Sequence, residues 1–357
     1  MSGVTQRLLV TGGAGFIGAN LACTLARRHP GWEITALDNL KRRGSELNLP
    51  RLRDAGVRFE HGDVRLLPDL EAVGEIDAIV ECSAEPSVMA GIDGSPDYLI
   101  GSNLFGAYNC LELARRRDAF LVFLSTSRVY PVKTLEGLTH EEAETRFTLA
   151  HEQPVPGASP AGISEQLPMA GARTLYGATK LAAELLIEEY RETYGLRSVI
   201  NRCGVIAGPW QMGKVDQGVF TYWMLAHHFG RPLRYIGFSG TGKQVRDLLH
   251  VDDLVDLIER QLAAPEHWDG ITANVGGGQG CSLSLVETTG LCSEITGNTL
   301  SVECSAESRP GDIPVYISDC SKLFSLTDWR PRRDARAVLA DIHAWVLANE
   351  SALASAL

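Results

Sequence analysis

The 357-residue chain lacks the long apolar segments that membrane and secreted proteins carry. No run approaches about 18 uninterrupted apolar residues, the lower limit for a membrane-spanning helix. The opening residues, MSGVTQRLLV, contain no apolar core of a secretion signal. We therefore expect a cytoplasmic protein that does not have a membrane as its partner.

Basic clusters and cysteine pairs are missing as well. The formal net charge is −11 and no block of basic residues stands out, so we expect no nucleic-acid partner. The eight cysteines are scattered, with no CxxC pair and no Cys/His cluster. This spacing gives no zinc site and favours reduced thiols over a disulfide framework. His227 and His228 have no third ligand in view, so we expect no metal.

The first half of the chain alternates short apolar strands with helices. Strands are predicted at RLLVTG, WEITALD, VRFEHGD, DAIVECSA, FLVFLSTS and RSVINRCGV, and helices at 16–28, 102–117 and 177–195. Strands that are regularly separated by helices are typical of a parallel, doubly wound sheet. We therefore predict an α/β protein with a Rossmann-type sheet.

After about residue 205 this regularity fades. Short strands are predicted at 233–238 and 271–276, and helices near 251–263, 282–296 and 335–348. We interpret this part as a smaller α/β domain over the carboxyl edge of the sheet. The expected domains are residues 1–204 and 205–357, with segments that can interleave.

Three glycines connect the first strand to the first helix. Gly12, Gly15 and Gly18 form G-x-x-G-x-x-G, in which Gly12 permits a tight turn and Gly15 lets a pyrophosphate approach the backbone. Gly18 lets the helix and the strand pack closely, and the phosphates meet the free N–H groups at the helix start. Glycine-rich turns without a ligand are common, so this pattern depends on its context.

Two carboxylates supply that context. Asp38 ends the second strand, 20 residues after Gly18, where it can accept hydrogen bonds from the ribose hydroxyls of a dinucleotide. The Asp38 carboxylate would repel a 2′-phosphate, which favours NAD over NADP. The basic residues 41–43 follow it, and their positive charge would favour NADP. Asp63, after the third strand, is placed to meet the adenine; the alternative is that it only starts a turn.

A second set of candidate functional residues consists of Tyr176, Lys180 and Thr126. Tyr176 and Lys180 are four residues apart at the start of a predicted helix, so they share one helix face. A nearby ammonium lowers the pKa of a phenol from its usual value of about 10 and favours the phenolate, which is a usable base. Thr126 ends the fifth strand, at the sheet edge where such folds bind ligands. Together these residues indicate proton-coupled hydride transfer.

The chain resembles the extended short-chain dehydrogenase/reductase family of nucleotide-sugar epimerases and dehydratases over nearly its whole length. The matching stretches are TGGAGFIGANL, LDNL, HGDVR, STSRVY, LYGATK, NRCGVIAGP and KQVRDLLHVDDL. Within the family it is most similar to the CDP-paratose (CDP-tyvelose) 2-epimerases, through DNLKRRG, ETRFTL at 144–149, DQG at 216–218 and GKQVRDLLH at 242–250. The resemblance implies a retained NAD, a nucleotide-sugar substrate and a homodimer formed by a pair of helices.

The resemblance also implies roles for particular residues. The catalytic residues are then Thr126, Tyr176 and Lys180. The expected cofactor-binding residues are Gly12, Gly15, Phe16, Ile17, Gly18, Asp38, Asn39, Arg42, Asp63, Val64, Cys82, Ser83, Ala84, Asn103 (near the nicotinamide ribose) and Cys203. The expected substrate-binding residues are Glu85, Ser127, Arg246 and Arg309. The two arginines suit phosphate oxygens, with a surface or interdomain salt bridge as the alternative. Glu85 either bonds a sugar hydroxyl or amine, or is a solvated loop carboxylate.

The chain departs from the family pattern at three places. Many relatives have H-x-A-A after the fourth strand, whereas this chain has ECSAEPSV, which puts Glu81 near the usual histidine. Val205 stands where relatives often carry a polar residue that faces the substrate. The Asp-Glu pair that dehydratases use for elimination is replaced by Ser127 and Arg128.

These features favour an NAD-dependent epimerase that inverts a secondary carbinol of a nucleotide sugar by transient oxidation, at C2 of a CDP-hexose. The alternatives are a UDP-sugar 4-epimerase, a nucleotide-sugar ketoreductase or dehydratase, and a non-catalytic NAD-binding protein. The presence of both Tyr176 and Lys180 speaks against the last of these.

Overall fold

The computed structural model describes residues 6–92, 94–213, 217–305, 307 and 311–356. The chain divides into two compact units. Unit 1 comprises Met1–Thr126, Leu175–Arg202 and Val255–Thr272, and unit 2 comprises Ser127–Thr174, Cys203–Leu254 and Ala273–Leu357. The chain thus passes between the units several times. The division into a cofactor part at 1–204 and a substrate part at 205–357 stays a prediction.

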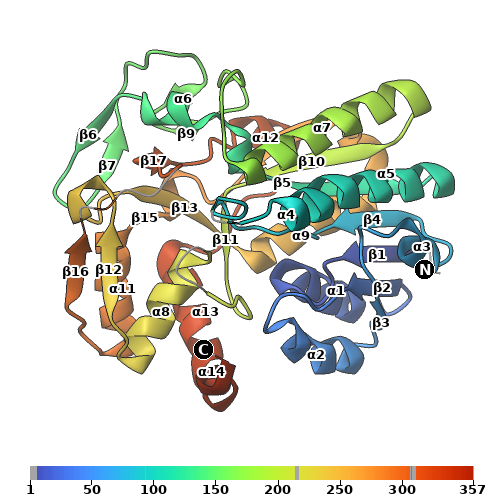
Figure 1. Cartoon of the computed structure of the whole chain (residues 1–357), viewed down its shortest axis with the longest axis horizontal. Coiled ribbons are helices and arrows are strands. Elements are labelled where there is room, and N and C mark those ends of the chain that lie inside the picture. The colour runs from blue at the N-terminus through green and yellow to red at the C-terminus, as the bar shows by residue number, and fades with distance from the viewer. Residues whose placement is uncertain (1–5, 93, 214–216, 306, 308–310, 357) are drawn as a thin grey trace. The chain divides into compact units, whose positions relative to one another are not determined.

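A seven-stranded sheet forms the centre of unit 1 (Figure 1). Its strand order is β14-β10-β5-β4-β1-β2-β3. The strands are β1 (Arg7–Thr11), β2 (Glu33–Asp38), β3 (Arg58–His61), β4 (Ala78–Glu81), β5 (Phe120–Thr126), β10 (Ser198–Cys203) and β14 (Ile271–Val275). The pairs β1–β2, β2–β3, β1–β4 and β4–β5 are parallel. This order confirms the predicted Rossmann-type, doubly wound sheet.

Helices cover both faces of this sheet. One face carries α1 (Phe16–Arg28), α2 (Leu49–Asp54) and the part of α9 (Val251–Ala263) that belongs to unit 1. Arg28 and His29, at the end of α1, bond Asp256 and Glu259 of α9. The other face carries α3 (Leu67–Glu71), α4 (Asp97–Ile100), α5 (Gly106–Arg117) and α7 (Leu175–Tyr194), and Figure 1 shows α5 and α7 side by side. The short α10 (Pro265–Trp268) completes the unit.

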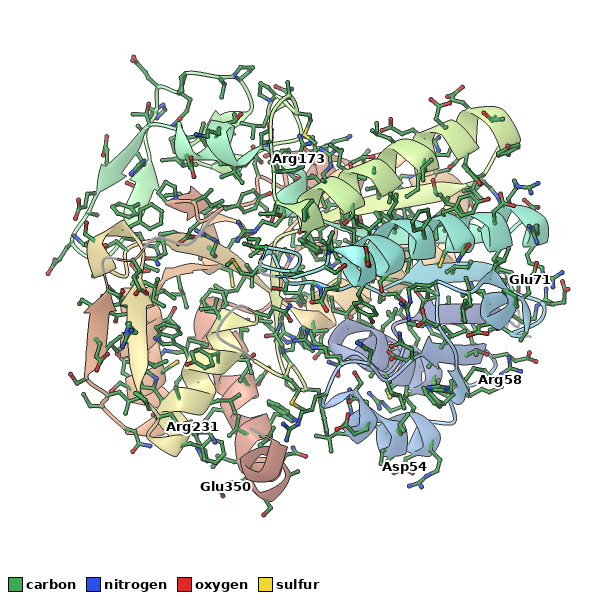
Figure 2. The ribbon with its side chains drawn as sticks, in the orientation of Figure 1. Asp54, Arg58, Glu71, Arg173, Arg231 and Glu350 are labelled. Carbon is green, nitrogen blue, oxygen red and sulfur yellow. The ribbon has the colours of Figure 1, made fainter. Side chains whose placement is uncertain are left out.

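The core of unit 1 lies between the sheet and the layer of α5 and α7. It includes Leu9, Ile79, Leu121 and Phe123 of the strands, and Leu111 and Ile187 of the helices. All seven residues of β5 are buried, because helices cover both faces of the sheet. Charged side chains such as Asp54 and Glu71 point outward from the helices (Figure 2). Buried apolar strands therefore produced the clear strand signal in the sequence.

Unit 2 is built from smaller pieces. Its four-stranded sheet contains β11 (Val205–Ala207), β13 (Val245–His250), β15 (Ser282–Ser284) and β17 (Val315–Tyr316). Paired strands are β12 (Leu233–Ile236) with β16 (Val302–Ser305), β6 (His140–Glu142) with β7 (Phe147–Leu149), and β8 (Ala158–Ser159) with β9 (Gly162–Ile163). The helices are α6 (Val132–Glu136), α8 (Val219–Phe229), α11 (Leu285–Thr296), α12 (Ser321–Leu326), α13 (Ala335–Ala348) and α14 (Glu350–Ala356). Apolar side chains of α8 and α13, among them Trp223, Leu339 and Trp345, form its core.

The structure differs from the sequence prediction in several elements. The helix predicted at 282–296 begins only at Leu285, because Ser282–Ser284 forms strand β15. The strand predicted at 271–276 for the second domain is β14, which joins the central sheet as its edge strand. The helix predicted at 102–117 begins with a π-helical turn at Gly101–Phe105 before α5. The strand predicted through residue 205 is divided, because β10 ends at Cys203 and β11 joins β13 in the other sheet. Within the described residues, no helix combines the length and the apolar character that crossing a membrane requires.

Candidate functional site

The carboxyl ends of β1 and β4 lie next to each other in the middle of the sheet. Strands β2 and β3 follow β1 on one side of this point, and strands β5 and β10 follow β4 on the other side. Such a switch point leaves a crevice beyond the strand ends, where doubly wound proteins bind their ligands. The glycine turn after Thr11 and the loop after Glu81 both start there.

The glycine turn after β1 requires glycine for steric reasons. Gly12 has a φ of +60°, and a Cβ at this position would lie 2.8 Å from the carbonyl oxygen of Cys82. A Cβ at Gly18 would lie 2.2 Å from the carbonyl oxygen of Gly12. Gly13, which was not among the expected site residues, is equally constrained, because a Cβ there would lie 2.6 Å from Cβ of Ala36 in β2. The side-chain-free turn therefore packs directly against β2 and the start of the loop after β4.

The first turn of α1 is suited to an anion. Gly15 is the N-cap, no side chain caps the helix, and its first turn contains no acidic residue. Phe16 and Ile17 open the helix, and both are half-buried. Backbone N–H groups at a helix start carry partial positive charge and bind phosphate. The turn and the helix start thus fit the pyrophosphate of a dinucleotide.

Asp38 at the end of β2 organises the same turn. Its Oδ2 accepts a hydrogen bond of 3.1 Å from the backbone N–H of Ala14, and its Oδ1 accepts one of 2.8 Å from Leu40. Burial raises the pKa of Asp38, and these N–H donors oppose that rise. Asn48, which sequence analysis did not single out, donates from Nδ2 to the carbonyl oxygen of Ala14 at 2.9 Å.

Asp63 belongs to a polar group beside the end of β2. It accepts hydrogen bonds from Asn39 Nδ2 at 2.9 Å and from Arg65 Nη2 at 2.7 Å, and Arg65 above all lowers the pKa of Asp63 to about 2. The ring of Tyr98 lies 4.9 Å from Lys41 Nζ and 5.0 Å from Arg65 Cζ. Tyr98 and Arg65 were not among the expected site residues: Tyr98 lies in none of the matching stretches, and Arg65 ends the stretch HGDVR, in which only Asp63 and Val64 were expected to bind the cofactor.

The remaining cofactor residues expected near this group lie as follows. Arg42 is half-buried in the segment after β2. Val64 points its side chain into the core, and its carbonyl oxygen accepts a hydrogen bond of 2.8 Å from Asn109. Only the backbone of Val64 is therefore placed to meet a nucleotide.

The three expected catalytic residues all belong to unit 1. Thr126 is the last residue of β5 and is buried. Tyr176 and Lys180 lie one turn apart in the first half of α7. Lys180 Nζ forms an ion pair of 3.1 Å with Glu81 Oε2. Burial acts to lower the pKa of Lys180, but the negative charges of Glu81 and Tyr176 outweigh it, so this pKa lies above its ordinary value.

Asn103 ties the loop after β4 to α7. Its Oδ1 accepts the backbone N–H of Glu85 at 2.8 Å, and its Nδ2 donates to the Glu85 carbonyl oxygen at 3.1 Å and to Thr179 Oγ1 at 3.3 Å. In this loop Cys82, Ser83 and Glu85 are half-buried and Ala84 is exposed. Asn103 therefore shapes the loop, and its expected place near the nicotinamide ribose stays a prediction.

The other expected residues belong to unit 2. Ser127 starts a short 3₁₀ turn, and Cys203 ends β10 with its side chain buried. Arg246 on β13 donates from Nη2 to Asp312 Oδ1 at 2.8 Å and from Nη1 to the Val245 carbonyl oxygen at 2.7 Å. Both residues belong to unit 2, so this is a partly buried ion pair within one unit, and the expected diphosphate contact of Arg246 stays a prediction. Arg309 lies outside the described residues.

The chain belongs to the NAD-dependent epimerase/dehydratase family, because residues 8–276 match the model of the "NAD dependent epimerase/dehydratase family". It is 29% identical over 351 residues to a CDP-paratose 2-epimerase of Salmonella typhi, covering 95% of this chain and 99% of that protein. It is 31% identical over 351 residues to a dTDP-glucose 4,6-dehydratase of Mycolicibacterium smegmatis, covering 97% and 95%. The structure of a Thermus thermophilus UDP-glucose 4-epimerase in complex with NAD matches with a TM-score of 0.75 at 27% identity, covering 95% and 98%.

The family membership confirms three expectations at once. The protein is an enzyme, its cofactor is NAD, and its fold is that of the short-chain dehydrogenase/reductase epimerases. When bound, NAD supplies the acceptor and donor of a hydride. The glycine turn, the start of α1 and Asp38 are the parts of this chain that fit it.

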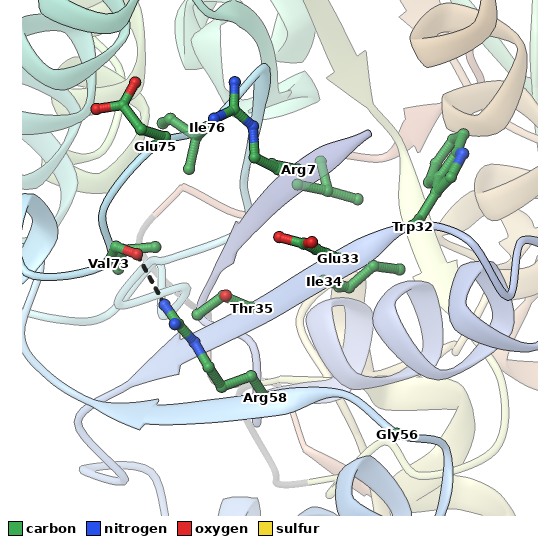
Figure 3. A pocket seen from close by; sticks show the side chains of 11 residues that line it. Arg7, Trp32, Glu33, Ile34, Thr35, Gly56, Arg58, Val73, Glu75 and Ile76 are labelled. Carbon is green, nitrogen blue, oxygen red and sulfur yellow. Dashed lines mark hydrogen bonds between the residues drawn. The ribbon is translucent and has the colours of Figure 1, made fainter. Parts of the chain in front are cut away.

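A pocket lies at the edge of the sheet opposite to the glycine turn (Figure 3). It measures about 330 Å³ and is lined by residues at the amino ends of β1 and β2, including Arg7, Trp32 and Glu33. Arg7 is engaged by Asp77, at 2.6 Å from Nη2 to Oδ1, and Arg58 donates to the Val73 carbonyl oxygen at 2.8 Å. Both arginines of this pocket are thus engaged by neighbouring groups of unit 1. Among the described residues, no cluster of His, Cys, Asp and Glu is arranged to hold a metal ion.

Proposed function

We propose that the protein is an epimerase that inverts one secondary carbinol of a nucleotide sugar by transient oxidation. Tyr176 as phenolate takes the hydroxyl proton while hydride leaves the same carbon, and the resulting ketone rotates before hydride returns to its other face. Tyr176 then gives the proton back to the oxygen. Thr126 holds that oxygen, and Lys180 favours the phenolate. The proposal depends on the presence of Thr126, Tyr176 and Lys180, and on the residues that follow Thr126 in the chain.

The residues after Thr126 argue against a dehydratase. Elimination of water from a sugar needs an acid and a base beside the carbons that react, and the dehydratase pattern places them directly after the threonine. Here the positions hold Ser127 and Arg128, and Arg128 Nη1 donates to the carbonyl oxygen of Gly311 at 3.0 Å. A hydroxyl and a bound guanidinium do not supply that acid–base pair.

The proposed substrate is a CDP-hexose and the proposed centre is C2. Both rest on the similarity to CDP-paratose 2-epimerase, and on the stretches 144–149 and 242–250. In the first of these, Arg146 donates from Nε to Glu287 Oε1 at 2.8 Å and from Nη2 to the Ser282 carbonyl oxygen at 2.8 Å. A UDP-sugar 4-epimerase is the second candidate, because the same trio serves any carbinol presented to it, and a UDP-glucose 4-epimerase is among the similar structures.

A panel of CDP-, UDP-, GDP- and dTDP-sugars, with products identified by NMR, tests the substrate. We expect conversion of a CDP-hexose to its C2 epimer. Inversion at C4 of a UDP-sugar would replace this assignment with the second candidate. A 4-keto-6-deoxy product would show the dehydratase instead.

The mechanism is tested by running the reaction in D₂O. Hydride that leaves and returns within one site brings no solvent deuterium to the inverted carbon. Deprotonation beside a carbonyl would introduce deuterium there. Substantial deuterium at the inverted carbon would therefore overturn transient oxidation, whatever the sugar.

We also propose that the enzyme is a homodimer whose subunits meet through α5 and α7. The outer surfaces of these helices and of the turn before α5 expose large apolar side chains, namely Phe105, Tyr108, Leu185 and Tyr194. A monomer that exposes several such residues on neighbouring helices leaves apolar area for a partner to cover. A second copy of this chain presents the same surface, as a two-fold interface requires.

The cytoplasm is the proposed location. All eight cysteines are free, and seven of them are buried or half-buried. Unpaired thiols of this number fit a reducing compartment. Cell fractionation followed by immunoblotting tests this, and recovery with the membrane pellet or the secreted fraction would contradict it.

A further inference from the structure

Glu81 at the end of β4 forms a deeply buried ion pair with Lys180 of α7. Its Oε2 lies 3.1 Å from Lys180 Nζ, and the two side chains are only 1% and 3% exposed. The backbone N–H of Ser83 also bonds the Glu81 carboxylate.

The pair matters because Glu81 has the largest of the effects that raise the pKa of Lys180, ahead of Tyr176. Burial without a partner disfavours an ammonium and shifts the pKa of a lysine downward by up to about 3–5 units. Lys180 Nζ also lies 4.5 Å from the centre of the Phe123 ring of β5, which is a weak partner compared with a carboxylate. Glu81 therefore contributes most of what keeps this amine charged.

Four other titratable groups lie near the pair, and each has a weaker effect on the pKa of Lys180 than Glu81 has. Glu184, one turn further along α7, is bound by Arg202 at 2.7 Å and by the Ser125 hydroxyl. Tyr176 of α7, Cys82 after β4 and Cys110 of α5 also interact electrostatically with Lys180 or with Glu81. The pKa of Cys110 is raised well above its ordinary value, mainly by burial, so this thiol is neutral at physiological pH.

We propose that Glu81 is a positioning residue that holds the Lys180 ammonium in its buried place and keeps it protonated across the working pH range. Lys180 then stays available to favour the Tyr176 phenolate. This inference rests on the proposed function for the roles of Tyr176 and Lys180, but the charge state of Lys180 is measurable without any substrate.

The direct test follows the lysine by NMR. The chain has six lysines, so the Cε signals of ¹³C-labelled lysine are few enough to resolve, and Lys180→Arg assigns the one of interest. In the NAD-bound protein we expect Lys180 to titrate above its ordinary range. In Glu81→Gln we expect its titration to fall by at least about one pH unit. An unchanged titration in Glu81→Gln would overturn the proposal, even if the enzyme acts on another sugar.

The second readout is the pH profile of kcat with an accepted substrate. In Glu81→Gln, kcat should begin to fall at a lower alkaline pH than in the wild type, because Lys180 loses its proton at a lower pH. Glu81→Asp keeps the charge and should restore part of the alkaline range. Glu81→His is neutral at alkaline pH and should behave like Glu81→Gln, which provides a second variant if the first does not fold.

A matched control separates positioning from general loss of stability. Glu112 of α5 also forms ion pairs in unit 1, with Arg115 at 2.9 Å and Arg116 at 3.3 Å. Glu112→Gln should leave both the Lys180 titration and the pH profile in place. If Glu81→Gln lowered activity equally at every pH, as a purely structural loss does, the proposal would fail.

Discussion

Asp38 Oδ2 accepts a hydrogen bond of 3.1 Å from the backbone N–H of Ala14, so the carboxylate at the end of β2 is joined to the glycine turn after β1. One side chain thus shapes the phosphate turn and places negative charge where the adenosine ribose is expected. These two effects can be separated by experiment, because an amide keeps an acceptor oxygen and removes the charge.

The wild-type protein should carry NAD after purification without any being added, and the nucleotide released by denaturation should be NAD. Asp38→Asn should shift the ratio of NADP to NAD affinity toward NADP by at least about tenfold, because a carboxylate repels a 2′-phosphate. Calorimetry on the stripped protein measures both affinities. A wild-type preparation that is empty and consumes NADPH in step with product would favour a reductase instead.

Tyr176→Phe should lower kcat by about 10²–10⁴, because only the phenolic oxygen that moves the proton is removed. The bound NAD and the melting temperature should stay as in the wild type. Tyr190→Phe, 14 residues further along the same helix, is the matched control, since that hydroxyl donates to Glu112 Oε1 at 2.7 Å. Near-normal turnover in Tyr176→Phe would show that the catalytic assignment is wrong.

Leu185→Arg should convert the dimer to a monomer in sedimentation velocity experiments. Leu185 is 55% exposed on α7, and a charge placed there would be buried without a partner in the proposed interface. Leu347→Arg on α13 replaces an equally exposed leucine of unit 2 and should leave the dimer intact. A wild-type protein that sediments as a monomer at micromolar concentration would refute the interface.

The ion pairs of Glu112 should make the free energy of unfolding depend on pH in the acid range. Hydrogen bonds from Arg115, and with them the contacts from Tyr190 and Arg116, lower the pKa of Glu112 to about 2 in the folded protein. A carboxyl whose pKa is depressed by folding stabilises the fold above its unfolded pKa, and this contribution is lost as the pH falls through the folded value. The difference in unfolding free energy between wild type and Glu112→Gln should therefore be full at pH 7, narrow below about pH 4.5 and vanish near pH 2. A difference that is constant with pH would exclude an ionic origin.

Local sequence patterns predicted the strands of the central sheet and the first helix well. The α1 helix was predicted with its observed bounds, and the buried residues of β5 gave an unmistakable apolar run. Tyr176 and Lys180 could be placed together because a helix brings residues four apart onto one face. Each of these inferences uses only neighbours along the chain.

Features that depend on distant parts of the chain were not predicted. The Glu81–Lys180 pair joins residues 99 positions apart, and the bonds from Asn103 to Glu85 cross 18 positions. The π-helical turn at Gly101–Phe105 was not predicted either, because the apolar spacing around it does not distinguish it from an α-helix. Sheet membership of β14 depends on pairing with β10, which no local period reveals.

The interleaving of the two units sets the order in which the chain can fold during synthesis. Unit 1 needs its segments Leu175–Arg202 and Val255–Thr272, which leave the ribosome long after β5. Until β10 emerges, the apolar strand FLVFLST is an open sheet edge on the nascent chain. Exposed edges of this kind aggregate or recruit chaperones, so the interval between residues 126 and 198 is the vulnerable stage of biosynthesis.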